Sequence, residues 1–260
     1  MPPSTGPTRE WFRLTSMTSQ RLDRELVVRG LARSRAQAQS MIVDGQVVID
    51  GVIVRRPAEP VGPNARIEAP SDPYVSRAAY KLLGALDDLH LSVSGRALDA
   101  GASTGGFTQV LLERGCDEVI AIDVGTDQLS PLLRDDPRVT VWEQTNLRQL
   151  TPEHVEHRPV DLVVADVSFI SLTLLIGPLT SVTAADGRLL LLVKPQFEVG
   201  RDRLAKGGVV RSAELQQEAV RGVVDAAGGH GWPITAVTPS RLPGSAGNQE
   251  FFELLDRGGA

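Results

Sequence analysis

The chain has 260 residues, of which 42% are hydrophobic and 23% are charged, a composition typical of soluble globular proteins. At roughly 150 residues per domain, this length predicts one large domain, or an ordinary domain with a small one. The longest aliphatic run, Leu189–Val193, is too short to cross a bilayer, and the N-terminal segment lacks the apolar core of a signal peptide. A single cysteine, Cys116, excludes an intramolecular disulfide and a cysteine-built zinc site, so a reducing cytoplasm is the expected location.

The net charge of −5 is unevenly distributed along the chain. Residues 21–66 contain eight arginines against five acidic residues, a net charge of +3, so the rest of the chain carries −8. This division predicts a basic module, suited to contacts with nucleic-acid phosphates, joined to an acidic body. Three of the 27 basic residues are lysines, whose amine can lose a proton in a protein far more readily than a guanidinium can: Lys81, Lys194 and Lys206.

The sequence predicts four segments. Residues 1–19 show no periodic apolar pattern and are expected to form a disordered leader, within which Met17 is an alternative start. A compact α+β module is expected over residues 20–69 and a proline-containing linker over residues 70–75. The larger domain then covers residues 76–260, and the small module coincides with the basic part of the chain.

The small module is expected to contain two short helices and a β-hairpin. Ser34 is placed to cap the second helix and Gly45 to end it. Asp50-Gly51 lies between two β-branched runs, which is the pattern of a two-residue hairpin turn. Apolar residues at helical spacing indicate the helices, first Leu22, Leu26 and Leu31, and then Ala38, Met41 and Ile42.

Beyond Ser76, apolar strands alternate with helical segments, which predicts an α/β fold with a mostly parallel sheet covered by helices on both faces. The connection over residues 240–248 is short and rich in Gly, Pro and Ser, so the last strand is expected to run antiparallel. Seven strands are expected, near residues 96–100, 118–123, 138–142, 161–166, 187–194, 233–239 and 249–255.

The first of these strands runs into a glycine-rich turn and a helix, over Ala97–Phe107. Small residues there let the backbone approach a ligand, although structural turns of similar composition are common, and the spacing is not that of the dinucleotide fingerprint. The next strand ends in Asp123, 24 residues after Asp99, where a carboxylate can accept hydrogen bonds from ribose hydroxyls or simply cap a turn. Together these residues resemble the cofactor site of S-adenosylmethionine-dependent methyltransferases.

Two further side chains are expected at the carboxyl ends of central strands, where open α/β sheets bind ligands. Lys194 follows the most apolar strand, and Asp166 ends another. A lysine in such a crevice can act as a base or stabilise an oxyanion, whereas the alternative is a structural Lys–Asp pair. Taken alone, Lys81 is expected on a solvated helix face, because it lies off the apolar stripe of its helix. Glu250 is likewise expected to be an exposed carboxylate at an edge strand.

Considered together, Lys81, Asp166, Lys194 and Glu250 resemble the Lys-Asp-Lys-Glu tetrad of the FtsJ-type ribose 2′-O-methyltransferases. Four stretches resemble the TlyA family in particular: VSRAAYKL from Val75, LDAGASTGGFT from Leu98, ADVSFISL from Ala165 and VKPQFEVG from Val193. The segment from Arg21 to Gly51 is similar to the alpha-L RNA-binding motif of ribosomal small-subunit protein four. The likeness extends from about residue 20 to residue 256.

The resemblance implies a seven-stranded methyltransferase sheet with a small RNA-binding domain, and methyl transfer from S-adenosylmethionine to cytidine 2′-hydroxyls in ribosomal RNA of one or both subunits. In this mechanism Lys194 takes the hydroxyl proton or stabilises the alkoxide, and Asp166 orients it. The implied cofactor-binding residues are Asp99, Gly101, Ser103, Thr104, Gly105, Gly106, Phe107, Asp123, Asn146 and Asp166. The implied catalytic residues are the tetrad itself.

Arginines of the basic module are expected to contact RNA phosphates, with a solvated helix face as the alternative. Few aromatic residues occur there, which argues against a base-stacking platform. No metal site is predicted, because His154 and His157 have no nearby cysteine. The residues expected to bind RNA are Arg21, Arg24, Arg29, Arg33, Arg35, Arg55 and Arg56.

Three other functions remain open at this point. A non-catalytic RNA-binding or ribosome-assembly factor would bind the cofactor without transferring its methyl group. A cytolysin, suggested by the name haemolysin that some members of the family carry, needs an amphipathic or membrane-spanning segment, and none is visible. A base-directed methyltransferase usually has an amide-and-proline loop or a cysteine nucleophile after the fourth strand, where this chain has Asp166-Val-Ser-Phe.

Overall fold

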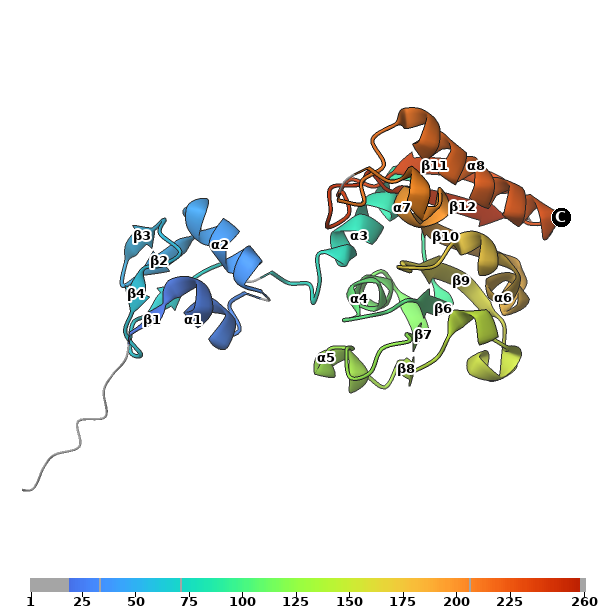
Figure 1. The fold of residues 1–260 in the computed structure, drawn as a ribbon. Helices are drawn as coiled ribbons and strands as arrows, with labels where there is room; N and C mark the ends of the chain where they lie inside the picture. The colour runs from blue at the N-terminus through green and yellow to red at the C-terminus, as the bar shows by residue number, and fades with distance from the viewer. Residues whose placement is uncertain (1–18, 33, 71, 206, 258–260) are drawn as a thin grey trace, which may run out of the picture. The chain divides into compact units, whose positions relative to one another are not determined.

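The computed structural model describes residues 19–32, 34–70, 72–205 and 207–257. The chain divides between Pro73 and Tyr74 into two compact units, which are described here one at a time (Figure 1). The expected leader, apart from Ser19, lies outside the described residues, and so do Arg33 and Lys206.

The first unit contains the two helices and the hairpin that the sequence predicts. The Ser34 hydroxyl caps the second helix by accepting a hydrogen bond from the Gln37 amide at 3.2 Å. The first helix ends at Val28, before Gly30 with its φ of +69°, so the expectation that Leu31 belongs to this helix is wrong. The elements are β1 (Gln20–Arg21), α1 (Leu22–Val28), α2 (Arg35–Val43), β2 (Val47–Ile49), β3 (Val52–Val54), β4 (Pro60–Val61) and β5 (Ile67–Glu68).

These short elements surround a small apolar core. Leu22 and Leu26 of α1 are fully buried, as is Ile42 of α2. A three-stranded antiparallel sheet with the order β3-β2-β5 packs on one side, and β1 pairs with β4. At the hairpin turn, Asp50 and Gly51 both have positive φ values, +49° and +85°, which is the backbone that an Asp-Gly turn favours.

The second unit is a seven-stranded sheet with the order β11-β12-β10-β9-β6-β7-β8 (Figure 1). The five strands from β10 to β8 run parallel, and β12 enters antiparallel between β10 and β11, which confirms the expected fold class. The strands are β6 (Gly95–Ala100), β7 (Cys116–Ile122), β8 (Val139–Trp142), β9 (Val160–Ala165), β10 (Thr183–Val193), β11 (Ile234–Pro239) and β12 (Phe251–Asp256). The helices are α3 (Ala78–Asp88), α4 (Gly106–Glu113), α5 (Pro131–Arg134), α6 (Ile176–Ser181), α7 (Pro195–Glu198) and α8 (Ala213–Gly229).

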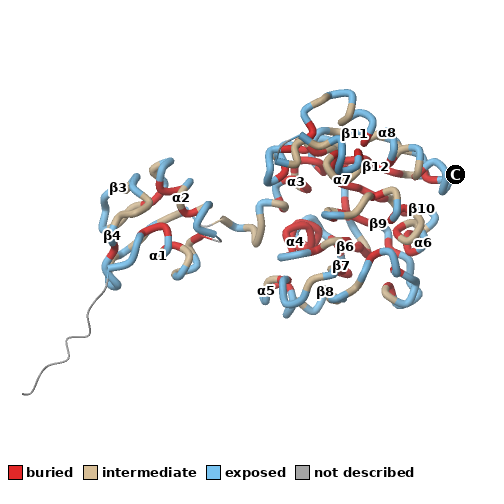
Figure 2. The backbone as a smooth tube through the Cα atoms, in the orientation of Figure 1, coloured by how far each residue is buried: buried red, intermediate tan, exposed pale blue. Residues whose placement is uncertain are grey.

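Strand β10 shows why both faces of the sheet are covered. Its alternate side chains enter different clusters: Leu189 and Leu191 pack with α6 and α8, whereas Leu190 and Leu192 pack with α3 and α4. Figure 2 shows buried backbone along the central strands and exposed backbone on the outer sides of the helices. In the part of the chain that the structure describes, no helix combines the length and apolar character needed to span a membrane.

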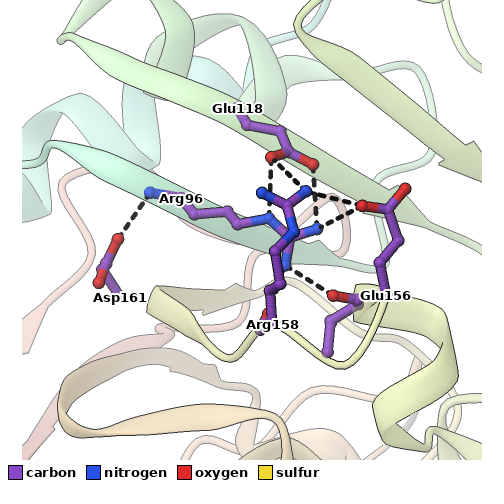
Figure 3. A network of polar contacts seen from close by, with 6 residues as sticks. Arg96, Glu118, Glu156, Arg158 and Asp161 are labelled. Atoms are coloured by element: carbon purple, nitrogen blue, oxygen red, sulfur yellow. Dashed lines mark hydrogen bonds and ion pairs between the residues drawn. The ribbon is translucent and has the colours of Figure 1, made fainter.

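A polar network joins the amino-terminal ends of three strands (Figure 3). The Arg96 guanidinium at the start of β6 donates to both oxygens of Glu118 in β7, at 2.8 and 3.0 Å, and to the carbonyl of Val155 at 2.7 Å. The Arg96 amide donates to Asp161 of β9 at 2.7 Å, and Arg158 pairs with Glu118 at 3.3 Å. Arg96 holds the pKa of Glu118 below its usual range, because it stabilises the charged carboxylate. The carboxyl ends of these strands lie at the opposite end of the sheet and take no part in this network.

Candidate active site

The turn after β6 is shaped by glycines that other residues could replace only with strain. Gly101 has a φ of +89°, and a Cβ atom there would lie 2.8 Å from the carbonyl oxygen of Asp166. Gly105 has a φ of +95° and faces Leu133. The Asp123 carboxylate, which follows β7, holds this turn by accepting a hydrogen bond from the Ser103 amide at 2.9 Å, and its other oxygen accepts one from the Gly125 amide at 2.7 Å.

This turn borders a pocket of about 470 Å³ at the carboxyl edge of the sheet. Five residues predicted to bind the cofactor line it: Gly101, Ser103, Asp123, Asn146 and Asp166. A second pocket, of about 230 Å³, shares four lining residues with the first, Gly101, Ser103, Asp166 and Ser168. Among the other residues predicted to bind the cofactor, Thr104, Gly106 and Phe107 line the second pocket, whereas Asp99 and Gly105 line neither.

Asp99 lies beneath the glycine turn and is fully buried. One carboxyl oxygen accepts a hydrogen bond from the Thr108 hydroxyl at 2.7 Å, and the other has no partner among the described residues. Burial raises the pKa of Asp99 to about 7, and the nearby charge of Asp166 adds to this effect. Asp99 therefore supports the turn through its hydrogen bond to Thr108 and does not line either pocket, whereas Asp123 and Asp166 line the larger pocket.

The four tetrad residues form two ion pairs. The Lys194 ammonium, at the end of β10, lies 2.6 Å from the Asp166 carboxylate, which follows β9. The Lys81 ammonium, on α3, lies 2.5 Å from the Glu250 carboxylate, which immediately precedes β12. Because β12 runs antiparallel to β10, its amino end lies at the same sheet edge as the carboxyl ends of the parallel strands. This reversal explains how a residue before the last strand joins residues that follow β9 and β10.

Two expectations for single residues are wrong. Lys81 is buried, with 7% of its side chain exposed, and does not lie on a solvated helix face. Glu250 has 2% of its side chain exposed and precedes an internal strand of the sheet, so it is not an exposed edge carboxylate. Each charge offsets the energetic cost of burying the other. The two residues are 169 positions apart, so local sequence patterns do not reveal the pair.

Sequence reasoning missed residues around Lys194. Its ammonium donates a hydrogen bond to the Ser168 hydroxyl at 2.9 Å. The next residue, Phe169, lines the larger pocket, is 89% exposed and has a φ of +65°. Its ring centroid lies 5.2 Å from that of Phe197 on α7. In the sequence, Ser168 and Phe169 belong to the stretch ADVSFISL from Ala165, shortly after Asp166, but that stretch assigns neither residue a role.

Several arginines of the first unit have partners within that unit. Arg21 and Arg35 both contact the fully buried carboxylate of Asp23, each at 3.0 Å, and hold its pKa well below the usual range. Arg29 pairs with Glu25 at 2.8 Å, and Arg55 donates to the Val43 carbonyl at 2.9 Å. These side chains support the module, although those of Arg21 and Arg35 are still about half exposed, at 51% and 58%. Arg24 and Arg56 are exposed, and Arg33 lies outside the described residues.

Comparison with known proteins identifies the larger unit. The family model of FtsJ-like methyltransferases matches residues 74–257. The chain belongs to the FtsJ-like methyltransferase family. The S4 domain model matches residues 20–67 of this FtsJ-like protein.

Across the described residues, no group of three or more His, Cys, Asp or Glu side chains is arranged to hold a metal ion.

The relatives of this FtsJ-like protein cover both units. The 16S/23S rRNA (cytidine-2′-O)-methyltransferase TlyA of Mycobacterium tuberculosis is 50% identical over 239 residues, which are 90% of this chain and 89% of the relative. A solved structure from Streptococcus thermophilus that carries the name hemolysin is 35% identical, with a TM-score of 0.73 over 93% of this chain and 89% of that one. An S-adenosylmethionine-dependent methyltransferase from Mesorhizobium loti, 16% identical, shares the fold alone, with a TM-score of 0.50 over 68% of this chain and 98% of that one.

Proposed function

We propose that this protein transfers a methyl group from S-adenosylmethionine to the 2′-hydroxyl of a cytidine in ribosomal RNA of one or both subunits, acting in the cytoplasm. The observation that carries the proposal is the Lys194–Asp166 pair, which lies where a cofactor-sized pocket adjoins a second pocket. The substrate class follows from the 50% identity to a relative named for this reaction.

The larger pocket suits S-adenosylmethionine. Asp123 and Asp166 are among its lining residues, and none of the described residues that line it is Lys or Arg, so it favours a cation over a polyphosphate. Gly101 and Ser103 bring backbone to its wall, and Asp123 can accept hydrogen bonds from ribose hydroxyls. When bound, the cofactor supplies a methyl group activated by a positively charged sulfur.

Lys194 and Asp166 act on the acceptor. A ribose hydroxyl is a weak nucleophile, so it must lose its proton or have its developing negative charge stabilised as it reacts. The Lys194 amine lines the second pocket, and its Nζ atom takes the hydroxyl proton or donates a hydrogen bond to the alkoxide. Asp166, 2.6 Å away, holds Nζ in place. Lys81 and Glu250 complete the tetrad as a buried pair of opposite charges.

The basic first unit binds the RNA by contacts to its phosphates. Arg24 and Arg56 are exposed, and Arg21 and Arg35 keep about half of their side-chain surface exposed while they contact Asp23. Such contacts position an RNA by its backbone and shape and do not read its bases. Binding should therefore weaken steeply as the salt concentration rises.

Tritium transfer from methyl-labelled S-adenosylmethionine to ribosomal subunits tests the proposal. The subunits come from cells that lack the gene. The protein should label the RNA, and the label should survive in alkali-resistant dinucleotides, because a 2′-O-methyl group blocks cleavage of the adjacent phosphodiester. Lys194→Ala should reduce labelling at least 100-fold, whereas Arg138→Ala, which removes an exposed positive charge paired with Asp136, should not.

The outcomes separate the competing functions. Label that alkali releases as methylated mononucleotides, with no resistant dinucleotide, would indicate a base-directed enzyme. Tight RNA and cofactor binding without any labelling would indicate a non-catalytic assembly factor. Full activity of the Lys194→Ala variant would remove Lys194 from the mechanism.

A further inference from the structure

The Lys194 amine is held on two sides by residues of one short segment. Asp166 and Ser168 both follow β9 and are two positions apart. The Asp166 carboxylate contacts Nζ at 2.6 Å, and the Ser168 hydroxyl accepts a hydrogen bond from Nζ at 2.9 Å. Only 10% of the Lys194 side chain is exposed. The amine therefore has little freedom to turn.

The number of hydrogens on the amine gives this arrangement a chemical consequence. An ammonium carries three N–H donors in tetrahedral directions. The hydrogen bond to Ser168 fixes one of these directions. The Asp166 carboxylate, 2.6 Å away, attracts the ammonium by its charge without hydrogen-bond geometry, so the remaining directions are set by rotation about the bond that Ser168 holds. In the neutral amine the hydrogen bond to Ser168 uses one N–H bond, and the second N–H bond and the lone pair take the other two directions. In either protonation state, the hydrogen bond to Ser168 restricts which sides of the amine can face an acceptor.

Ser168 lies between the two pockets, next to the amine that it orients. It lines both pockets, as Asp166 does, whereas Lys194 lines only the second. The segment that carries Ser168 is tied to α7, which follows Lys194. Glu198 of α7 accepts a hydrogen bond from the Leu172 amide at 2.9 Å, and the rings of Phe169 and Phe197 lie 5.2 Å apart. The contacts of Glu198 and Phe197 with this segment therefore help to fix the distance between Ser168 and Lys194.

We propose that Ser168 is a positioning residue for the reaction, and that its hydroxyl fixes the rotation of the Lys194 amine so that the free N–H or lone pair meets the acceptor oxygen. This inference rests on the proposed function for its kinetic consequence. The reacting proton leaves the acceptor O–H bond and forms the third N–H bond of the lysine, so Ser168 itself gains and loses no proton.

Kinetics with three variants test the proposal. Ser168→Ala removes the acceptor, Ser168→Thr keeps a hydroxyl, and Ser181→Ala is the control, because that exposed hydroxyl donates to the Pro178 carbonyl of its own helix, at 2.7 Å. Loss of a hydrogen bond to a charged group corresponds to roughly a 10- to 100-fold change. We expect Ser168→Ala to lower kcat by this factor, with a smaller change in KM for S-adenosylmethionine, and Ser168→Thr to restore most of the rate.

A second readout does not depend on activity. Because the chain contains three lysines, labelling with ¹⁵N-lysine gives three side-chain amine signals, which Lys→Arg variants assign. The Lys194 amine protons should exchange slowly with water in the wild type and in Ser168→Thr, and at least fivefold faster in Ser168→Ala. Unchanged exchange in Ser168→Ala overturns the inference, and so does an unchanged kcat. If the wild type labels no RNA, the proposed function fails, while amine exchange still decides whether Ser168 holds Lys194.

Discussion

Replacing Lys81 with methionine leaves the Glu250 carboxylate, which is 2% exposed, without the ammonium 2.5 Å away. The remaining polar neighbour, the Gln196 amide nitrogen, lies 3.5 Å from the other carboxylate oxygen and cannot compensate a full charge. Removing one member of a buried ion pair costs about 3–5 kcal/mol. At about 2–4 °C per kcal/mol for a domain of this size, the melting temperature should fall by about 6–20 °C.

The double variant Lys81→Met/Glu250→Gln separates stability from catalysis. Both side chains keep nearly their original shape and neither is charged, so at least half of the lost stability should return. Methyl transfer to ribosomal RNA should stay below a tenth of the wild-type rate, because the tetrad is still incomplete. Thermal unfolding and tritium transfer measure the two effects on the same samples. Additive single-variant effects on melting would refute the ion-pair argument, and a double variant with normal methyl transfer would show that the pair is purely structural.

Three other predictions follow from described contacts. Gly101→Ala places a Cβ atom 2.8 Å from the Asp166 carbonyl oxygen and should weaken S-adenosylmethionine binding at least tenfold by calorimetry. Gly222→Ala, whose Cβ would meet no described atom within 4 Å outside its own helix backbone and chain neighbours, should not weaken it, and equal affinities would contradict this account of the turn. Burial raises the pKa of Glu253 from 4.5 to about 8, so this carboxyl favours the folded state below pH 4.5 and loses that contribution as the pH rises toward 8. Glu253→Gln should remove this pH dependence of stability. The difference in melting temperature between wild type and variant should change between pH 5 and pH 9 by the equivalent of a few kcal/mol. A difference that stays constant would show that Glu253 is not the group responsible. The Arg21 hydrogen bond lowers the pKa of Asp23, so the first unit should lose stability as the pH falls below about 4, and Asp23→Asn should show a weaker acid dependence by amide exchange.

Local sequence patterns predict most of the helices, strands and turns of the fold. The Asp50-Gly51 pair needs no distant contact to form its turn, because both residues tolerate the positive φ that the turn requires. The aliphatic run ending at Val193 is long enough to mark a strand buried on both faces. The spacing of Leu31 predicts a helical position, but Gly30, with its positive φ, ends that helix before Leu31.

The site was less accessible from the sequence, because its members meet only after folding. Strand ends predicted that Asp166 and Lys194 approach each other, since neighbouring parallel strands end at one edge. The burial of Lys81 depends on Glu250, which lies in a different part of the chain, so helix periodicity placed Lys81 in solvent. Ser168 and Phe169 lie in a connection without periodicity, and their roles depend on α7.

The network around Arg96 lies at the sheet edge opposite the pockets and fixes the starting points of β6, β7 and β9. Strand register is thereby set independently of the connections that line the pockets. Substitutions in those connections can therefore reshape the two pockets without shifting the strands beneath them. The starts of these strands and the lining of the pockets can therefore vary separately among relatives.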